Sequence, residues 1–375
     1  MKRNLLTLLV LLAAQAMMAQ LTSLGLENET NLEKAIKENR VSKDYIPKLE
    51  VVNGYIYAAT PQGLYKLEVD KTSTWDKVQI TDELVCDVTV HGDTLLILTS
   101  NALYISTNGG ESSVKIPTDS IAKEKPNAKL QDMAVHPNTV DTIFIAYEGL
   151  SYTADMGKTW KTINTDIDYM SFSLDGICYN PHVPNQLVGY YNNQILTESE
   201  MIVSKDGGTS WAVTYGFSSP RSCYDVVFHP TDKDKLIAFG ASLYSISEDG
   251  GKHWNRSKAI EAWDIVYDVR NPEVLYGATA DGVYRSVDGG LTWNVFYQNE
   301  NVGEARSLVM YNDMLAIYTY QRGIYLLDVD ALEASISSAQ ADVIITPYYD
   351  LMGREVDKPT RGIYIKNGRK VVIGN

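Results

Sequence analysis

The 375-residue chain has only three cysteines, five histidines and six phenylalanines. Beyond its N-terminus it also has no apolar run near the roughly 20 residues that a transmembrane helix needs. Cys86, Cys178 and Cys223 are an odd number and lack metal-ligand spacing, so we interpret them as small buried thiols. The histidines form no H-x-x-x-H or Cys-His pattern. We therefore expect neither a metal site nor a cofactor.

Basic charge is scarce as well, because 33 Lys and Arg residues stand against 47 Asp and Glu residues. Residues 1–19 contain two of the basic residues, and residues 345–375 contain six basic and three acidic ones. The body between these ends therefore holds 25 basic and 44 acidic residues, a net charge of −19. A surface this acidic repels phosphate backbones, which excludes nucleic acid as a partner.

One short sequence motif, here called the repeated word, recurs along the chain. Such repeats indicate the architecture before any other signal. Four copies end in tryptophan, namely "YTADMGKTW", "VSKDGGTSW", "SISEDGGKHW" and "RSVDGGLTW", and a decayed fifth copy reads "ISTNGGESS". The leading hydroxyl residues are spaced by 47, 51, 43 and 39 residues, and they are Ser106, Thr153, Ser204, Ser247 and Ser286. This spacing is typical of propeller blades, which repeat every ~40–50 residues.

Strand patterns accompany these words. Seven segments of alternating apolar and polar residues, such as "GLYKL" and "GVYRS", begin at residues 63, 102, 149, 201, 242, 282 and 323. Another β-rich segment precedes each one, so every unit has room for about four short strands. We predict an all-β fold, a seven-bladed β-propeller with four-stranded antiparallel blades, over residues 45–335. Because the seventh unit becomes polar after its third strand, we expect residues 20–44 to supply a closing strand.

The repeated word resembles the Asp-box, or BNR repeat, Ser/Thr-x-Asp-x-Gly-x-x-Trp. This motif occurs in sialidases, sortilin-type propellers, xyloglucanase-type hydrolases and the photosystem II assembly factor. Its residues suit a tight hairpin between the third and fourth strands, where aspartate caps the turn, glycine supplies positive φ and tryptophan fills space. A calcium loop is the alternative, but it needs six to eight oxygen ligands and each copy offers one carboxylate. We assign structural roles to Thr153, Asp155, Gly157, Trp160, Ser204, Asp206, Gly208, Trp211, Ser247, Asp249, Gly251, Trp254, Ser286, Asp288, Gly290 and Trp293.

The N-terminus is typical of an exported protein. Residues 1–19 contain Lys2 and Arg3, then an apolar run, then small residues near Ala19. We interpret this segment as a signal peptide cleaved after Ala19, and an uncleaved membrane anchor is the alternative. No cysteine lies near the cleavage point, which argues against a lipoprotein.

After a linker at residues 336–344, the last segment, residues 345–375, carries further β signals. Asn367-Gly368 between "GIYIK" and "RKVVI" predicts a β-hairpin. The words "DLMGREV", "GIYI" and "NGRKVVI" resemble the type A sorting domains that Bacteroidetes attach to cargo of the type IX secretion system. The resemblance implies a secreted, periplasmic or cell-surface protein.

Alignment of the predicted innermost strands reveals a candidate site on the face opposite the repeated turns. One column contains Asp87, Asp132, Gly176, Asp225, Asp264 and Ser307. These aspartates either tie blades together by accepting backbone N–H bonds, or form an acidic ring that holds a cation or sugar hydroxyls. Tyr224 and Trp263 in the preceding column could stack on a sugar or peptide, and the long insertion "YYNNQILTESEM" could overhang the face.

The candidate residues on this face can be compared with the catalytic residues of two enzyme families. Arg221, Arg306 and Arg322 would suit the three-arginine clamp of sialidases, but those are six-bladed and begin with an Arg-Ile-Pro word. Here Tyr45 stands in the place of that arginine. Xyloglucanase-type hydrolases use two opposed carboxylates, for which Asp225 and Asp264 are the candidates. Those enzymes need two propellers around one cleft, however, and this chain has one.

We therefore predict a non-catalytic binding propeller that recognises a polysaccharide or a cell-envelope protein, and we expect a monomer. The ligand-binding candidates are Asp87, Asp132, Asp225, Asp264, Tyr224, Trp263, Arg221, Arg306 and Arg322. A glycoside hydrolase that uses Asp225 and Asp264 is the alternative, because one fold supports many functions.

Overall fold

The computed structural model describes residues 21–335 and 348–373 with gaps. The gaps are residues 39, 42–44, 70–73, 81–83, 119–120, 122–128, 164–173, 194–197, 215–222, 242, 258, 301, 351, 357–361 and 367–368. The chain divides into two compact units, one of Thr22–Leu327 and one of Met1–Leu21 with Asp328–Asn375. The expected signal peptide and the linker at 336–344 lie outside the described residues.

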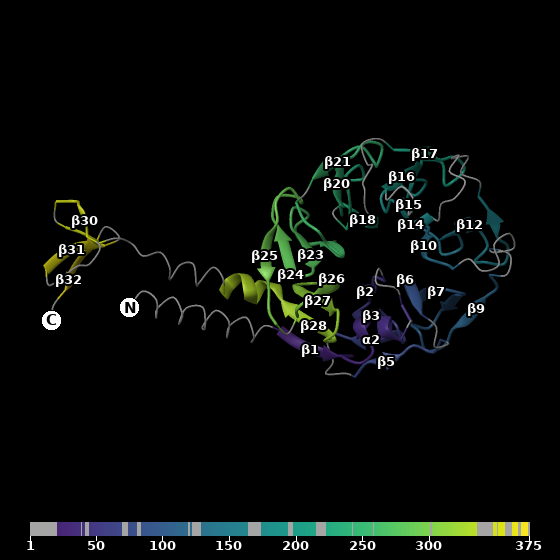
Figure 1. The fold of residues 1–375 in the computed structure, drawn as a ribbon, viewed down its shortest axis with the longest axis horizontal. Helices are drawn as coiled ribbons and strands as arrows, with labels where there is room; N and C mark the ends of the chain where they lie inside the picture. The colour runs from purple at the N-terminus through teal and green to yellow at the C-terminus, as the bar shows by residue number, and fades with distance from the viewer. Residues whose placement is uncertain are drawn as a thin grey trace. The chain divides into compact units, whose positions relative to one another are not determined.

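The larger unit is a ring of seven four-stranded antiparallel sheets, which we number as blades one to seven (Figure 1). Blade one contains β2 (Leu49–Val52), β3 (Tyr55–Thr60), β4 (Gly63–Glu68) and β5 (Asp76–Lys77). Blade two contains β6 (Val85–His91), β7 (Thr94–Thr99), β8 (Leu103–Ser106) and β9 (Val114–Ile116). Blade three contains β10 (Asp132–Val135), β11 (Ile143–Tyr147), β12 (Gly149–Thr153) and β13 (Lys161–Thr162).

The next three blades repeat this order of strands. Blade four contains β14 (Leu174–Tyr179), β15 (Leu187–Asn193), β16 (Glu198–Ser204) and β17 (Ala212–Val213). Blade five contains β18 (Cys223–Phe228), β19 (Leu236–Gly240), β20 (Leu243–Ser247) and β21 (Asn255–Ser257). Blade six contains β22 (Asp264–Tyr267), β23 (Leu275–Thr279), β24 (Gly282–Ser286) and β25 (Asn294–Tyr297).

Blade seven takes strands from both ends of the ring. It contains β26 (Ala305–Tyr311), β27 (Met314–Thr319), β28 (Ile324–Asp328) and β1 (Leu21–Gly25). In this sheet β1 lies beside β28, so a strand from the N-terminal side occupies the outermost position. The predicted seven-bladed, four-stranded antiparallel propeller is confirmed. Backbone hydrogen bonds between β1 and β28 close the ring.

The apolar core is divided among the seams between neighbouring blades. One cluster joins Met201 of blade four to Leu236 and the tryptophan Trp254 of blade five. Another joins Ile56 of blade one to Tyr318 of blade seven, across the closing seam. Because the core lies between blades, each blade depends on its neighbours for burial of its apolar faces.

A short helix, α2 (Leu32–Lys37), covers the closing seam. The side chain of Asn31 caps it by accepting the backbone N–H of Lys34 at 2.8 Å. Leu32 is fully buried in the cluster between blades one and seven, and its N–H donates to the carbonyl of Tyr320 at 2.9 Å. The segment between β1 and β2 therefore adds packing as well as a strand to the closure.

The long insertion "YYNNQILTESEM" of blade four extends the hairpin formed by β15 and β16. β15 and β16 are each seven residues long and remain paired from Leu187↔Ser204 to Asn193↔Glu198. Residues 194–197, at the tip of the insertion, lie outside the described residues.

The second unit contains a helical segment at residues 329–335 and a four-stranded sheet. Its strands are β29 (Tyr348–Tyr349), β30 (Glu355–Val356), β31 (Gly362–Lys366) and β32 (Arg369–Ile373). The predicted hairpin is confirmed as β31 and β32, which pair from Gly362↔Ile373 to Lys366↔Arg369. Asn367 and Gly368, which predicted it, lie outside the described residues.

The five repeated words form turns between third and fourth strands, and we call them the repeated turns. In the blade-six copy the Ser286 hydroxyl donates to Asp288 at 2.8 Å and accepts the Gly290 N–H at 2.9 Å. The Asp288 carboxylate also accepts the N–H and the hydroxyl of Thr292, at 2.9 and 2.6 Å. Asn108 takes the place of aspartate in the decayed copy and accepts the Ser106 hydroxyl at 2.9 Å. Each of these turns is thus closed by its own side chains.

The other copies follow the same pattern with small variations. Thr153 and Ser204 donate to Asp155 and Asp206 at 2.7 and 2.9 Å, and Ser247 donates to Asp249 at 3.0 Å. The hydrogen-bonding hydroxyls of Thr159 and Ser210 hold the pKa values of Asp155 and Asp206 at about 2, below the usual value. These carboxylates are therefore satisfied without a calcium ion.

Three of the tryptophans in the repeated turns bond to a glycine of their own turn. Trp211, Trp254 and Trp293 donate their indole N–H to the carbonyls of Gly208, Gly251 and Gly290 at 3.0–3.1 Å. Trp160 and Gly157 belong to the one copy that differs, in which the indole N–H reaches the carbonyl of Pro117 at 3.1 Å.

Truncation of these tryptophans should lower stability in proportion to their burial. Trp254 is 4% exposed and belongs to a core cluster, whereas Trp293 packs only partly buried against its cluster. We expect Trp254→Ala to lower the free energy of unfolding by about 3–5 kcal/mol and Trp293→Ala by less. Chemical denaturation would measure both.

Val287 provides the matched control, since it lies on the same turn as Trp293 and is 58% exposed. Val287→Ala should leave the unfolding free energy nearly unchanged. Equal stability of Trp254→Ala and the natural protein would contradict the structural role of the turn tryptophans.

Candidate functional site

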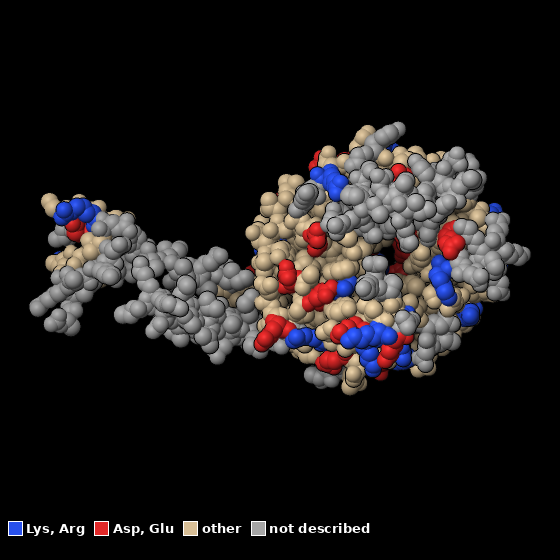
Figure 2. Space-filling view, in the orientation of Figure 1, with Lys and Arg blue, Asp and Glu red and all other residues tan. Residues whose placement is uncertain are grey.

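The candidate site lies where the innermost strands of the blades surround the axis of the ring. β2, β6, β10, β14, β18, β22 and β26 contact one another in this order around it. Figure 2 shows one face of the ring, with an opening near its centre and acidic side chains beside it. Asp87 and Asp225 lie within β6 and β18, and Asp132 and Asp264 begin β10 and β22. The ring therefore brings the predicted acidic column together.

Four of these inner strands contain a one-residue irregularity beside the column. On β6 the pairing passes from Val85↔Thr99 to Asp87↔Leu98, which leaves Cys86 as the extra residue. The same shift occurs on β14, β18 and β26, where the extra residues are Asp175, Tyr224 and Arg306. Such bulges re-aim side chains at sheet edges.

The column aspartates cap backbone N–H groups at this irregular edge. On the two bulged strands that carry an aspartate, the cap is local. Asp87 accepts the N–H of Val88 at 2.9 Å, and Asp225 accepts the N–H of Val226 at 2.7 Å. An innermost strand has no partner strand on its axial side, so N–H groups there need another acceptor.

On the other two bulged strands the column residue is Gly176 or Ser307, which has no carboxylate, and the preceding blade supplies the cap. Asp132 of blade three accepts the Ile177 N–H of blade four at 2.9 Å. Asp264 of blade six accepts the Leu308 N–H at 2.9 Å and the Ser307 hydroxyl at 2.8 Å. Two of the four aspartates thus tie neighbouring blades, and the other two cap their own strand.

The sequence analysis missed Lys48, which is the blade-one member of the same column. Ala59 donates its N–H to the Lys48 carbonyl at 2.9 Å, so Lys48 stands opposite Ala59 as Asp264 stands opposite Ala278. Its Nζ reaches Asp225 of blade five at 2.7 Å. The side chains of Lys48 and Asp225 are 33% and 30% exposed. The ring is therefore bridged from blade one to blade five by an ion pair.

Burial controls the titration of this cluster. Burial raises the pKa of Asp87 to about 6, although the Lys48 ammonium acts in the opposite direction. Burial also raises the pKa of Asp264 to about 6, of Glu50 on β2 to about 7, and of Asp132 well above its usual value. Several carboxylates around one ammonium therefore retain protons close to neutral pH.

A cation site was one interpretation of this ring, and the structure places the Lys48 ammonium there. Among the described residues, no group of three or more His, Cys, Asp and Glu side chains is arranged to hold a metal ion. The three cysteines lie on innermost strands as expected, but Cys86 and Cys178 are half-buried and only Cys223 is fully buried.

The expected stacking platform is already filled by the protein itself. Tyr224 and Trp263 stack on each other, with ring centroids 5.0 Å apart and 11° between the planes. The guanidinium of Arg306 lies 3.6 Å from the centre of the Trp263 ring and 4.8 Å from that of Tyr320. Both faces of Trp263 thus contact protein side chains in this conformation.

Arg306 and Arg322, the two predicted arginines among the described residues, differ in burial and surroundings. Arg306 is 5% exposed and its guanidinium binds Glu304 at 2.6 Å, because its extra position in the β26 bulge directs it into the aromatic stack. Arg322 is exposed on the turn between β27 and β28. Arg221 lies outside the described residues.

A second repeated turn, also missed from the sequence, connects the second and third strands on this face. The hydroxyls of Thr60, Thr99 and Thr279 donate to the carbonyl three residues later at 2.9–3.1 Å. Thr319 does the same four residues later at 2.8 Å. The available signal was a threonine that ends the second strand in words such as "VLYGAT" and "MLAIYT". These turns surround the mouth of the ring.

Comparison with known proteins supports the fold and leaves the function open. No family model and no curated protein matches the chain. YCF48 bound to D1 peptide has a TM-score of 0.54 at 18% identity, over 74% of this chain and 90% of that one. An ancestral GH74 enzyme has a TM-score of 0.58 at 14% identity, over 86% of this chain and 49% of that one.

A third similar structure is the extracellular domain of a putative one-component system from B. thetaiotaomicron. It has a TM-score of 0.57 at 11% identity, over 76% of this chain and 39% of that one. The chain thus spans about half or less of the two longer proteins. Among the described residues, no helix has the length and apolarity to cross a bilayer.

The buried carboxylates should make stability depend on pH in a defined direction. The pKa of Asp87 is raised in the folded protein, so its contribution is fully present below about pH 4 and is lost as the pH rises through about 6. Asp87→Asn should therefore raise the free energy of unfolding at pH 7.5 by roughly 1–3 kcal/mol and change it little at pH 4. Denaturant titrations at both pH values would test this.

Asp93→Asn is the control, because Asp93 is exposed in the turn between β6 and β7. Its effect should be small and equal at the two pH values. A destabilised Asp87→Asn variant at pH 7.5 would refute the assignment of a buried, electrostatically costly carboxylate.

Proposed function

We propose that this chain is an exported, non-catalytic binding propeller whose partner docks on the face formed by the second-to-third strand turns. The observation that supports this proposal most directly is the Lys48–Asp225 ion pair at the centre of that face. A carboxylate bound to an ammonium at 2.7 Å and to a backbone N–H at 2.7 Å is poorly placed to act as a nucleophile or base.

The exposed polar residues of this face are the proposed contacts. Asn101, Asp281 and Arg322 lie on the turns of blades two, six and seven, and all three are exposed. The partly exposed Lys48 and Asp225 lie at the mouth between these turns. Asp87 and Arg306, by contrast, are 6% and 5% exposed and serve the scaffold. Loops on a rigid scaffold are the usual site of recognition.

We also propose a protein family and a cellular location for this chain. The repeated turns carry the residues and hydrogen bonds that Asp-boxes require, which supports an Asp-box propeller. The signal-peptide pattern at residues 1–19 and the sorting-domain-like words at residues 345–375 favour export, with a type IX route in Bacteroidetes. An acidic body and an envelope location suit a polysaccharide or a cell-envelope protein as partner.

A glycoside hydrolase is the second candidate, and one observation favours it. Burial raises the pKa of Asp264 to about 6, and the charge of Asp225 acts in the same direction. A carboxylic acid protonated near neutral pH beside another carboxylate is the arrangement that glycosidases use. Similarity to part of an ancestral GH74 enzyme is compatible with either candidate.

A glycan array beside a hydrolysis assay on the same glycans separates the two candidates. We expect binding without turnover, and Arg322→Ala should weaken it about tenfold, as loss of a charged hydrogen bond does. Lys158→Ala, on the repeated turn of blade three, is the matched control and should bind normally.

Turnover that disappears in a folded Asp225→Asn or Asp264→Asn variant would instead establish the hydrolase. If neither binding nor turnover of any glycan occurs, the glycan partner is refuted, and pull-down from the cell envelope with the natural protein and Arg322→Ala would test a protein partner.

A further inference from the structure

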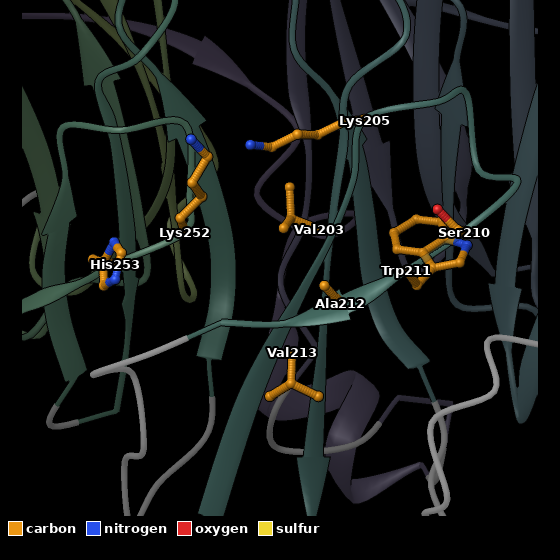
Figure 3. Close-up of a pocket in the computed structure, with 8 residues that line it drawn as sticks. All are labelled: Val203, Lys205, Ser210, Trp211, Ala212, Val213, Lys252 and His253. Carbon is orange, nitrogen blue, oxygen red and sulfur yellow. The ribbon is translucent and has the colours of Figure 1, made fainter.

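A pocket of about 370 Å³ lies between blades four and five, beside their repeated turns (Figure 3). Strands β16 and β17 contribute Val203, Ala212 and Val213 to its lining, and the blade-five turn contributes Lys252 and His253. The remaining lining residues are Lys205, Ser210 and Trp211. The volume is at the lower end of small-molecule pockets, which measure roughly 300–1,000 Å³.

Two lysines approach each other across one end of this pocket. Figure 3 shows these residues on neighbouring blades, with the amino group of Lys205 extended toward Lys252. The neighbouring Lys252 lowers the pKa of Lys205, and the charges of Asp249 and Asp234 offset this effect only in part. Two neighbouring like charges repel each other, so an anion between them would stabilise the pair.

The nearby carboxylates are already bound within their own segments. Asp206 accepts the N–H and hydroxyl of Ser210 at 2.9 and 2.6 Å. Asp249 binds the imidazole of His253 at 2.6 Å, and Asp234 pairs with Lys233 at 2.5 Å. A negative charge for the lysine pair is therefore best supplied by a ligand.

The lysine pair is specific to this seam of the repeat. Lys205 follows the leading hydroxyl residue, Ser204, of the blade-four turn. Lys252 follows the last glycine, Gly251, of the blade-five turn. At these positions the other seams carry Thr107 with Lys158, Ala154 with Thr209, and Glu248 with Leu291. Two facing cations are thus not a requirement of the turn, since the same turn forms without them.

We propose that this pocket binds a saccharide unit that carries one carboxylate, as in a uronic acid. The two ammonium groups hold the carboxylate, and the aliphatic floor of Val203, Ala212 and Val213 receives the apolar face of the sugar ring. Ser210 and His253 lie at the polar edge, where sugar hydroxyls can bond.

Two features favour this ligand over others. A long polyanion would be repelled by the surrounding body, whose net charge is −19, so an isolated carboxylate fits better than a polymer of charges. A peptide strand would have to add to the outer edge of β17, but that strand has only two residues. Strand addition depends on a row of backbone hydrogen bonds.

Titration of the full chain with glucuronate, glucose and N-acetyl-leucine, followed by NMR, tests the proposal. Glucuronate should bind with a Kd on the order of 1 mM, and glucose at least about tenfold more weakly. Lys252→Glu should abolish glucuronate binding. Because the amine of Lys205 has a lowered pKa, affinity should also fall earlier with rising pH than an unperturbed lysine would give.

Lys158→Glu, at the position of Lys252 in the blade-three turn, is the matched control and should bind glucuronate as the natural protein does. Equal binding of glucose, equal loss in both variants, or tighter binding of N-acetyl-leucine would each overturn the proposal. Lys48→Met should leave glucuronate binding unchanged, so the result is independent of the function proposed for the opposite face.

Discussion

Closure of the ring is the constraint on which the rest of this structure depends. Each blade buries its apolar faces against its neighbours, so an open ring would expose two such faces to water. This exposure is prevented where the first and last blades of the ring meet. There β1 pairs with β28, and Leu32 of α2 packs into the adjacent seam. The position of every inner strand, and of the column that they carry, follows from that closure.

Closure in turn creates a second requirement at the axis. Seven inner strands present edges that lack a partner strand, and four of them bulge beside the column. Aspartates cap the exposed N–H groups, so most of the repeated carboxylates serve the scaffold before any ligand. Their buried charges need compensation, which one lysine and raised pKa values provide. The exposed rim and the sites between blades are free of this requirement.

The two ends of the blades differ in how they can acquire function. The repeated turns satisfy their own carboxylates, and for that reason they tolerate substitutions at the intervening positions, as the pairs Ala154–Thr209 and Lys205–Lys252 illustrate. Four of the opposite turns use one buried threonine each, and those of blades two, six and seven expose Asn101, Asp281 and Arg322. Each seam and each turn can therefore change its chemistry without a change in fold.

The sequence by itself determined the blade number, the antiparallel strands and the turn residues, because these depend on local spacing that repeats along the chain. Only the tertiary structure decided what the unique residues do. Lys48 precedes its strand without any motif, and its role appears only when the ring brings Asp225 within 2.7 Å. Trp263 resembled a ligand platform until Tyr224 and Arg306, separated in sequence, covered its two faces. Contacts between blades join residues that lie tens to hundreds of positions apart, such as Asp132 with Ile177 and Ile56 with Tyr318, and no local pattern encodes such pairs.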